Sequence, residues 1–318
     1  MILRPIARGL LSYLPAVEKR RAGTTRGTSS ARYCYSVWLR HLVLAHEAGL
    51  VRTGTPVPAV VAELGPGDSI GIGLAALLSG ASRYIALDLV AYASSERNLA
   101  VLDELVELMR AQTPIPDAVE FPSVKPSLPS YAFPSRVLTD EHLARMLAPE
   151  RVASIRRALE HVDADLGLIS YRAPWFDAGV VEPDSIDMLF SQAVLEHVDD
   201  LEGAYAAMAA WLKPGGFASH EIALNAHYLA PEWNAHWTIS DPVWKLIRGK
   251  RPYLLNREPA STHVRLLGRS GMQIVNEVRV QVKSDVARSR LARRFRGMSD
   301  DDLTTRAIFV QAVKPARR

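Results

Sequence analysis

Residues 60–71 read VVAELGPGDSIG, and this stretch decides the fold. Its apolar run ends in an acid, Glu63, and two glycines follow with one residue between them, Gly65 and Gly67. Glycine lets the backbone turn sharply and leaves room for a ligand against the main chain. A buried strand that passes through glycine turns into a helix is typical of a nucleotide-binding junction in a parallel α/β sheet.

The glycine spacing distinguishes between two classes of such junction. The dinucleotide-binding fingerprint requires a third glycine at position 70, where Ile70 stands, and it has no acid in the place of Glu63. An oxidoreductase that uses NAD is therefore a weak alternative.

Polar residues follow two further apolar runs. Asp88 ends the run at 84–87, and an acid in this place can accept two hydrogen bonds from ribose hydroxyls. Residues 185–200 read SIDMLFSQAVLEHVDD, and the turn KPGG follows at 213–216. Together with E-x-G-x-G at 63–67, these segments resemble the motifs of class I S-adenosylmethionine (SAM) dependent methyltransferases. The resemblance covers roughly residues 58–225.

This resemblance implies an α/β, Rossmann-like fold: a seven-stranded, mostly parallel sheet with an antiparallel last strand, plus N-terminal and inserted helical elements. The apolar pattern predicts strands at 57–62, 83–87, 166–171, 186–191, 217–224, 273–281 and 306–313. Helices are predicted at about 30–49, 69–79, 94–112, 139–161, 201–212 and 285–295. Residues 226–262 read as irregular.

The chain divides into a helical cap at 1–56 and a SAM methyltransferase domain at 57–318. The domain carries an insertion at about 112–162, because the connection between the second and third strands is far longer than one helix needs. Six prolines between 113 and 135 predict an extended loop there. The insertion fits a functional cover, a packing embellishment or a dimer contact. Residues 225–262 are expected on the acceptor side.

The resemblance also implies residues that hold the cofactor. The backbone at Gly65 and Gly67 would lie against its sugar and methionine part. Glu63 would act there on the amino group, and Asp88 on the ribose. Gln192 follows the fourth strand and is expected beside the cofactor.

The adenine end departs from the family's pattern. Trp175 stands where many members have an acid. Three interpretations stay open: Asp177 replaces that acid if the loop is shifted, Trp175 stacks on adenine, or both residues only pack in the loop.

Candidate proton acceptors lie after the fourth and fifth strands. His227 is the first choice because it follows the fifth strand by a few residues. His197 and Glu221 are further candidates, with His220 and His236 as reserves. A structural role for His197 stays open, because the family has a Glu-His pair here whatever the substrate. No metal site is predicted.

Other residues on the acceptor side allow two interpretations each. Arg257 could hold a carboxylate or phosphate of the substrate. On the helix at 30–49, only one of Arg40 and His41 is expected to face the pocket. Three aromatic residues could stack on the acceptor or form the core of a lid: Trp233, Trp237 and Trp244.

Composition limits the partners. The 318 residues are 48% hydrophobic and 23% charged, which is ordinary for a globular protein. A net charge of +4, and the lack of a recognisable nucleic-acid module in the sequence, argue against nucleic acid. The single cysteine, Cys34, fits a packed thiol in a reducing cytoplasm, and no signal peptide or membrane-spanning segment is predicted. The basic helix at 285–295 could touch a membrane peripherally, hold an acidic glycan carrier or be a solvated face.

We therefore expect SAM-dependent O- or N-methylation of a small-molecule or glycan acceptor. The segment SARYCYSVWLRHL at 30–42 and the later H…W…N-R stretch look like bacterial methyltransferases of surface-polysaccharide or secondary metabolism. A methyltransferase-like protein without catalysis, which binds SAM or only a partner subunit, is the alternative. The sequence leaves the acceptor, the methylated atom and the oligomeric state open.

Overall fold

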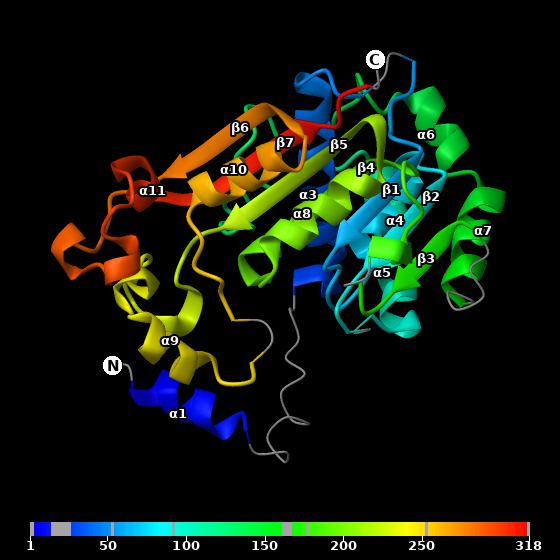
Figure 1. The fold of residues 1–318 in the computed structure, drawn as a ribbon. Coiled ribbons are helices and arrows are strands. Elements are labelled where there is room, and N and C mark those ends of the chain that lie inside the picture. The colour runs from blue at the N-terminus through cyan, green and yellow to red at the C-terminus, as the bar shows by residue number, and fades with distance from the viewer. Residues whose placement is uncertain are drawn as a thin grey trace.

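A seven-stranded sheet with the order β3-β2-β1-β4-β5-β7-β6 forms the centre of the molecule (Figure 1). The computed structural model describes residues 3–13, 27–51, 54–90, 93–160, 167–175, 178–251 and 254–316. The strands are β1 (Val60–Leu64), β2 (Arg83–Leu87), β3 (Ile169–Arg172), β4 (Ile186–Gln192), β5 (Leu212–Ala223), β6 (Gln273–Gln281) and β7 (Thr305–Val313). The first five are parallel, and β7 runs antiparallel between β5 and β6. The predicted Rossmann-like sheet is confirmed.

Helices cover both faces of this sheet (Figure 1). One face carries α3 (Ala31–Glu47), α4 (Gly71–Ser79) and α5 (Ser95–Arg110); the other carries α8 (Leu201–Trp211) and α10 (Ala260–Arg269). The strands are therefore apolar on both sides, as expected for a buried parallel sheet. Val61 of β1 packs with the first group of helices, whereas Ala62 and Leu64 pack with the second.

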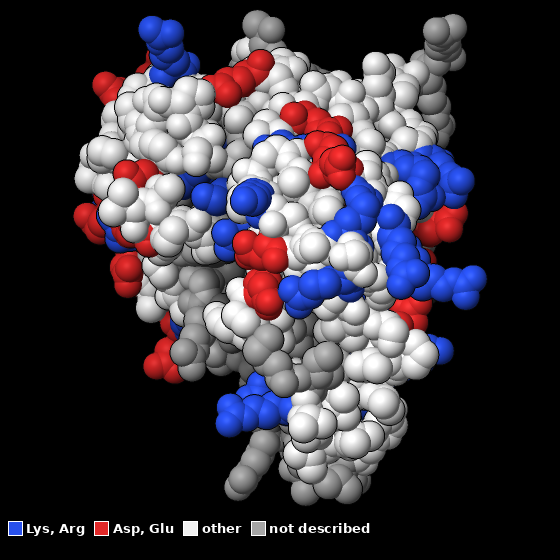
Figure 2. Space-filling model, turned by 90° about the vertical axis from the view of Figure 1, so that its left-hand side faces the viewer, with Lys and Arg blue, Asp and Glu red and all other residues white. Residues whose placement is uncertain are grey.

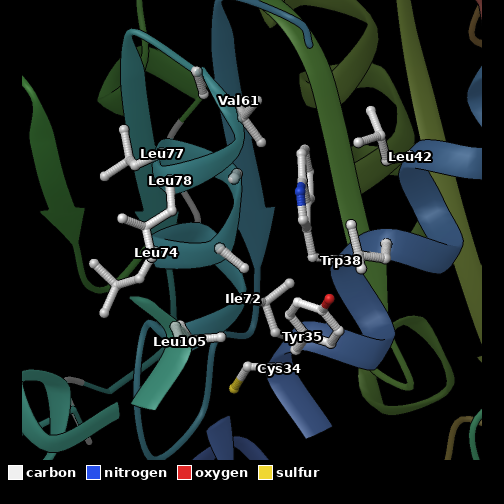
Figure 3. Packing of buried hydrophobic residues seen from close by; sticks show 14 of the residues in the cluster. Cys34, Tyr35, Trp38, Leu42, Val61, Ile72, Leu74, Leu77, Leu78 and Leu105 are labelled. Atoms are coloured by element: carbon white, nitrogen blue, oxygen red, sulfur yellow. The ribbon is translucent and has the colours of Figure 1, made fainter. Parts of the chain in front are cut away.

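The contact between α3 and α4 is close (Figure 3). Trp38 of α3 lies between the two helices, and its Nε1 donates to Ser79 Oγ over 2.8 Å. A Cβ on Gly71 would lie 2.5 Å from Cys34 Sγ, and a Cβ on Gly73 would lie 2.1 Å from the Tyr84 ring. The glycines of α4 therefore allow close packing. Cys34 is a buried thiol in this contact.

The helix α3 begins and ends where the sequence predicts. Ser30 caps it, because its side chain accepts from the Tyr33 amide. The chain leaves the helix through Gly49, whose φ of +67° suits glycine.

The insertion between β2 and β3 is anchored to α3. Residues 111–139 contain neither helix nor strand, as the prolines predict. Arg40 is 1% exposed, and its guanidinium donates to the carbonyls of Pro126 (2.6 Å) and Pro116 (3.1 Å). Tyr35 Oη donates to the Thr113 carbonyl over 2.6 Å. The helical pattern predicted at 139–161 forms two helices, α6 (Asp140–Met146) and α7 (Pro149–Glu160), because Pro149 starts a new helix.

The segment after β5 is more regular than expected. It contains α9 (Asp241–Arg248), and α1 (Leu3–Leu11) packs against α9 far from α3 (Figure 1). Within the predicted cap at 1–56, α3 therefore lies on the sheet and α1 on the acceptor-side segment. A final short helix, α11 (Asp300–Thr304), precedes β7. Within the described parts of the chain, no helix has the length and apolarity that a membrane span requires.

The predicted basic helix at 285–295 is wrong. Two short 3-10 turns, η7 (Arg288–Arg290) and η8 (Arg293–Phe295), take its place. Tertiary packing overrides the helical pattern, because Leu291 and Phe295 are buried against Trp233 and Trp237. Figure 2 shows basic side chains interleaved with acidic ones on this side of the molecule. Ion pairs join Arg288 to Asp300, Arg290 to Glu232 and Arg294 to Glu258.

Candidate functional site

The glycine loop lies where the strand order reverses. β1 pairs with β2 on one side and with β4 on the other, so the loops after β1 and β4 diverge from a common point. Glu63 is level with Phe190, and Leu64 is level with Ser191. Ligands of open α/β sheets bind at such a switch point, outside the carboxyl ends of the strands. The residues after β1, β2, β4 and β5 thus form the candidate site.

The glycine loop and Asp88 form one unit. Gly65 and Gly67 have φ values of +67° and +72°, and a Cβ on Gly65 would lie 2.6 Å from Val194 Cγ2. Asp88 Oδ2 accepts from the Gly67 amide over 3.3 Å, and its Oδ1 accepts from the Leu89 amide over 2.7 Å. Burial raises the pKa of Asp88, and these amides oppose that rise. Asp88 thereby fixes the second glycine turn.

Glu63 is a buried acid with one strong partner. It is 1% exposed, and Tyr84 Oη donates to its Oε2 over 2.5 Å. Burial raises the pKa of Glu63 to about 8, because a carboxylate loses its hydration there. A cation bound beside Glu63 would favour its ionised form.

The start of α4 is covered by a turn that the sequence analysis did not single out. Thr28 lies in η1 (Gly27–Ser29), and its Oγ1 accepts from the Ser69 amide over 3.1 Å. Asn98 of α5 accepts from the Ile70 amide over 3.1 Å. These side chains satisfy amides that a helix start leaves open. Only the threonine and serine content of the loop before α3 pointed to such a role.

Gln192 connects three elements of the site. Its Nε2 donates to Glu221 Oε2 over 3.0 Å, and its Oε1 lies 3.3 Å from His41 Nε2. The other nitrogen of His41 lies 2.7 Å from Ser219 Oγ. Burial lowers the pKa of His41 to about 4, so this imidazole is neutral. Of the adjacent pair on α3, His41 therefore points to Gln192, and Arg40 holds the insertion.

Glu221 is the buried acid at the end of β5. It is 1% exposed, and burial raises its pKa to about 8. Lys125 of the insertion lowers this pKa through its charge, so the insertion reaches the site. The pKa of Tyr33 is raised by burial first and then by the charges of Glu221, Glu63 and Glu196. The sequence analysis did not single out Lys125, because the sequence of a proline-rich loop does not show which of its residues lies near the site.

Glu196, His197 and His227 form a cluster beside Glu221. Glu196 is 2% exposed, and neither carboxyl oxygen has a hydrogen-bond partner among the described residues. His227 Nε2 lies 3.9 Å from Glu196 Oε1, and the rings of His197 and His227 stack with centroids 5.4 Å apart. Burial, and the charge of Glu221, raise the pKa of Glu196, while burial lowers that of His227. The sequence predicted the two histidines but gave Glu196 no role.

The two further candidate histidines, His220 and His236, are buried apart from the stacked rings of His197 and His227. His220 is fully buried, and its Nδ1 lies 2.8 Å from Ser191 Oγ. His236 is 2% exposed and packs on Trp237 with ring centroids 4.6 Å apart. Burial lowers both pKa values to about 3. Both imidazoles are therefore neutral.

Arg257 holds the acceptor-side segment together. It is 3% exposed and donates to the Ile239 carbonyl (2.7 Å) and to Asp241 (2.5 Å). Its guanidinium lies over Trp244, 4.4 Å from the ring centroid. The three tryptophans of this segment pack in apolar clusters, so they form the core of a lid: Trp233, Trp237 and Trp244. The expectation that Arg257 faces a substrate anion is not met.

Asn256 joins the lid to the end of β4. Its Nδ2 donates to the carbonyls of Leu195 (2.8 Å) and Val198 (2.9 Å), and its amide donates to the Glu196 carbonyl (2.8 Å). A narrow cleft between the lid and β5 is lined by Glu196, Asn225, His236 and Asn256, among others. The lid is thus held directly over the turn that carries Glu196 and His197.

The adenine side is only partly described. Trp175 is 7% exposed and packs edge-on against Trp211, with ring centroids 6.4 Å apart. This places its ring in the core beneath α8. Asp177 lies outside the described residues, so its exchange for the family's acid stays a prediction.

Comparison with known proteins gives one family model that matches part of the chain. The family model of the methyltransferase domain matches residues 136–219, which include β3, β4 and the L-E-H-V turn. The glycine loop after β1 lies outside the matched residues. No curated protein matches the chain significantly.

Solved structures with similar folds include several methyltransferases. A putative SAM-dependent methyltransferase from Listeria monocytogenes is 13% identical, with a TM-score of 0.42, over 85% of this chain and 97% of that one. A SAM-dependent methyltransferase from Mesorhizobium loti is 18% identical, with a TM-score of 0.41, over 83% and 94%. Phosphoethanolamine N-methyltransferase 2 from Haemonchus contortus, in complex with SAM, is 14% identical, with a TM-score of 0.42, over 91% of this chain but 58% of its own. TM-scores of this size do not by themselves establish a shared fold or function. The fold assignment rests on the strand order, and the functional argument rests on the residues of the site.

Proposed function

We propose that this chain, a class I SAM-dependent methyltransferase, methylates an oxygen or nitrogen atom of a small-molecule or glycan acceptor. One observation carries the proposal. Glu221, Glu196, His197 and His227 gather at the ends of β4 and β5, beside the glycine loop and beneath the lid. Groups that bind an acceptor and take its proton are thus adjacent to the position expected for SAM.

The charge of the site suits this cofactor. Glu63 and Asp88 lie at the glycine loop, and Glu221 and Glu196 lie at the next two strand ends; all four are buried. SAM carries a positive sulfonium, and its product has a neutral thioether. Glu63 and Asp88, when ionised beside the cofactor, therefore favour the reactant over the product through electrostatics.

Methyl transfer is an in-line displacement. A lone pair of the acceptor atom forms a bond to the methyl carbon, the carbon–sulfur bond breaks, and its electron pair stays on sulfur. The protein holds the two molecules in line and excludes water. We assign the released proton to Glu221, because a carboxylate with a pKa of about 8 is a matched base near neutral pH. Gln192 orients this carboxylate by its 3.0 Å hydrogen bond.

The acceptor side favours polar partners. The tryptophans of the lid pack in its own apolar core, so they present little surface on which an acceptor could stack. The groups that remain beside the cofactor position are carboxyl and imidazole groups, which hydrogen-bond to hydroxyls and amines. This composition supports a hydroxylated or amino-bearing acceptor, as in the glycan proposal.

Transfer of a labelled methyl group tests the proposal. Labelled SAM is incubated with panels of oligosaccharides, phenols and amines, and transferred label is counted. Glu221→Gln preserves the shape of the side chain and should lower turnover by about 10²–10⁴-fold, while SAM affinity changes less than about threefold. Glu120→Gln, at an exposed ion pair of the insertion, serves as the matched control and should change neither.

Two results would contradict the assignment. Wild-type turnover by Glu221→Gln would remove Glu221 as the proton acceptor. Binding of SAM by calorimetry without label transfer to any class of acceptor would favour a non-catalytic role for the chain.

A further inference from the structure

The cluster of Glu196, His197 and His227 has the composition of a metal site. One ligand atom from each residue, a carboxyl oxygen and two ring nitrogens, lies within 4.8 Å of the others. Glu196 and His197 come from the turn η4 (Leu195–His197), and His227 begins the turn η5 (His227–Leu229). Two segments that are distant in sequence thus bring three metal-binding side chains together.

Glu196 gives a second, independent indication of a ligand. Its carboxyl group is buried, and neither oxygen makes a hydrogen bond of full geometry with a described residue, although the amides of Glu196 and Ala223 lower its pKa. A buried polar group without a partner is costly, and protein structures rarely leave one unexplained. His227 Nε2 lies 3.9 Å from Glu196 Oε1, and no ion pair among the described residues joins Glu196 to a lysine or arginine. A bound cation would satisfy both oxygens.

Neighbouring residues fix the turn that carries Glu196 and His197, whereas the side chain of His227 can move. Asn256 binds the carbonyls on either side of the turn that carries Glu196 and His197. His227 is exposed, and its backbone has the unusual φ of +46°, which the Asn225 side chain supports by accepting from its amide over 2.8 Å. The imidazole of His227 can therefore move toward Glu196 without disturbing a packed core.

We propose that Glu196, His197 and His227 bind one divalent transition-metal ion, with Zn²⁺ as the simplest case. Two imidazoles and one carboxylate suit zinc, manganese, cobalt or ferrous ion, whereas Mg²⁺ and Ca²⁺ prefer oxygen ligands throughout. Three protein ligands leave coordination positions open for an exogenous oxygen.

The role of this ion rests on the proposed function, although its binding does not. An acceptor hydroxyl bound at an open position would be lowered in pKa and held beside the cofactor. Its proton would pass to Glu221, and its oxygen would form the new bond as the carbon–sulfur bond of SAM breaks. A role of the ion in the reaction would narrow the acceptor class to molecules that are methylated on a hydroxyl oxygen.

Metal binding is measured on the full chain without SAM or acceptor. Chelator-treated protein is titrated with Zn²⁺ by calorimetry, and with Co²⁺ by visible absorption, which reports imidazole ligation. We expect one ion per chain. Glu196→Gln and His227→Asn should each weaken binding by about 100-fold or more, because each removes a ligand and not merely a group that orients one. Asparagine is chosen at 227 because it tolerates positive φ.

Controls separate loss of the site from loss of the fold. His142→Asn removes a histidine of α6 that bonds the Ser79 carbonyl, and should leave Zn²⁺ affinity unchanged. SAM affinity of each variant should stay near that of the wild type, which shows that the fold persists. Mg²⁺ should not compete with Zn²⁺ at equal concentration.

Three outcomes would overturn the metal site. These are failure of folded wild-type protein to bind Zn²⁺ or Co²⁺, unchanged affinity in both ligand variants, or equal loss in His142→Asn. Methyl transfer at full rate by chelator-treated protein would overturn the role of the ion in the reaction. None of these results would count against SAM binding or methyl transfer itself.

Discussion

Glu63 and Asp88 end adjacent strands, yet their carboxyl groups have different surroundings. Glu63 has a tyrosine hydroxyl as its partner and a pKa raised to about 8, whereas Asp88 accepts from two backbone amides of the turns around it. Burial dominates in the first case, and amide hydrogen bonds oppose it in the second. Two amides therefore favour the carboxylate form of Asp88, whereas ionisation of Glu63 would need a cation beside it.

A side chain at Gly65 should prevent SAM binding. Alanine there would meet Val194 at 2.6 Å and would have to adopt a φ of +67°. We expect Gly65→Ala to weaken SAM binding at least about tenfold, and to destabilise the fold by about 1 kcal/mol or more. Calorimetry and urea unfolding measure the two effects. Gly268→Ala is the matched control, because a Cβ there meets nothing within 4 Å. Unchanged SAM affinity in Gly65→Ala would disprove the loop assignment.

Removal of the Asp88 carboxylate should weaken SAM binding by about ten- to a hundredfold. The carboxylate would bond the ribose, and it already fixes the turn at Gly67. Asp117→Ala is a suitable comparison, since Asp117 also accepts from two amides, those of Val119 and Glu120, but lies in the insertion. A change below twofold in Asp88→Ala would place Asp88 outside the site.

At the scale of elements, α3 links the sheet, the insertion and the site. Trp38 packs it on α4, Arg40 holds the carbonyls of the insertion, and His41 meets Gln192. These residues are neighbours on one helix, yet each faces a different element. The position of the insertion, and with it that of Lys125, thus depends on a helix outside the sheet.

Arg40→Met should release the insertion. The two carbonyls that Arg40 satisfies are buried, so their loss should cost about 2–4 kcal/mol of stability. Amide hydrogen exchange at 113–135 should accelerate more than exchange in β1 and β4. Arg32→Met, on the same helix, breaks an exposed pair with Glu120 and should cost at most about 1 kcal/mol. Equal exchange in the two variants would refute the anchoring role of Arg40.

At the scale of the whole molecule, buried acids link stability to pH. The pKa of Glu63 is about 8 in the folded protein and 4.5 in its ordinary environment. Below about pH 4.5 both states hold the proton, and the stability contribution is full. As pH rises toward 8, the unfolded chain releases its proton while the folded chain keeps it, so stability falls.

We expect the free energy of unfolding without SAM to decline between about pH 5 and pH 8, by up to a few kcal/mol. Glu63→Gln cannot ionise and should make this decline shallower, leaving the part that Glu221 contributes through its own raised pKa. Saturating SAM should also reduce it, because the positive amino group that Glu63 is expected to bind favours the ionised acid. Denaturant unfolding across this pH range measures all three. A decline of the same slope in Glu63→Gln would exclude Glu63 as its source.

The sequence by itself determined the sheet and the strand ends on which the candidate cofactor residues lie. The bounds of β2 and β6 are those predicted, and β1, β4 and β7 differ by a few residues. Apolar runs, glycine turns and the acids that follow them are local signals, and parallel strands bring their carboxyl ends to one edge. Glu63, Gly65, Gly67, Asp88 and Gln192 therefore lie where the order of motifs places them.

The tertiary structure alone decided the acceptor side. Nothing near Arg257 in the sequence shows that Trp244 and Phe295 enclose it, and the helical pattern at 285–295 yields to the burial of Leu291 and Phe295. The approach of His227 to Glu196 likewise depends on a lid that Asn256 fastens to the end of β4. Such contacts join segments distant along the chain, and their free energy comes from burial and hydrogen bonds that form only once the sheet is complete. Local sequence patterns therefore do not predict these contacts.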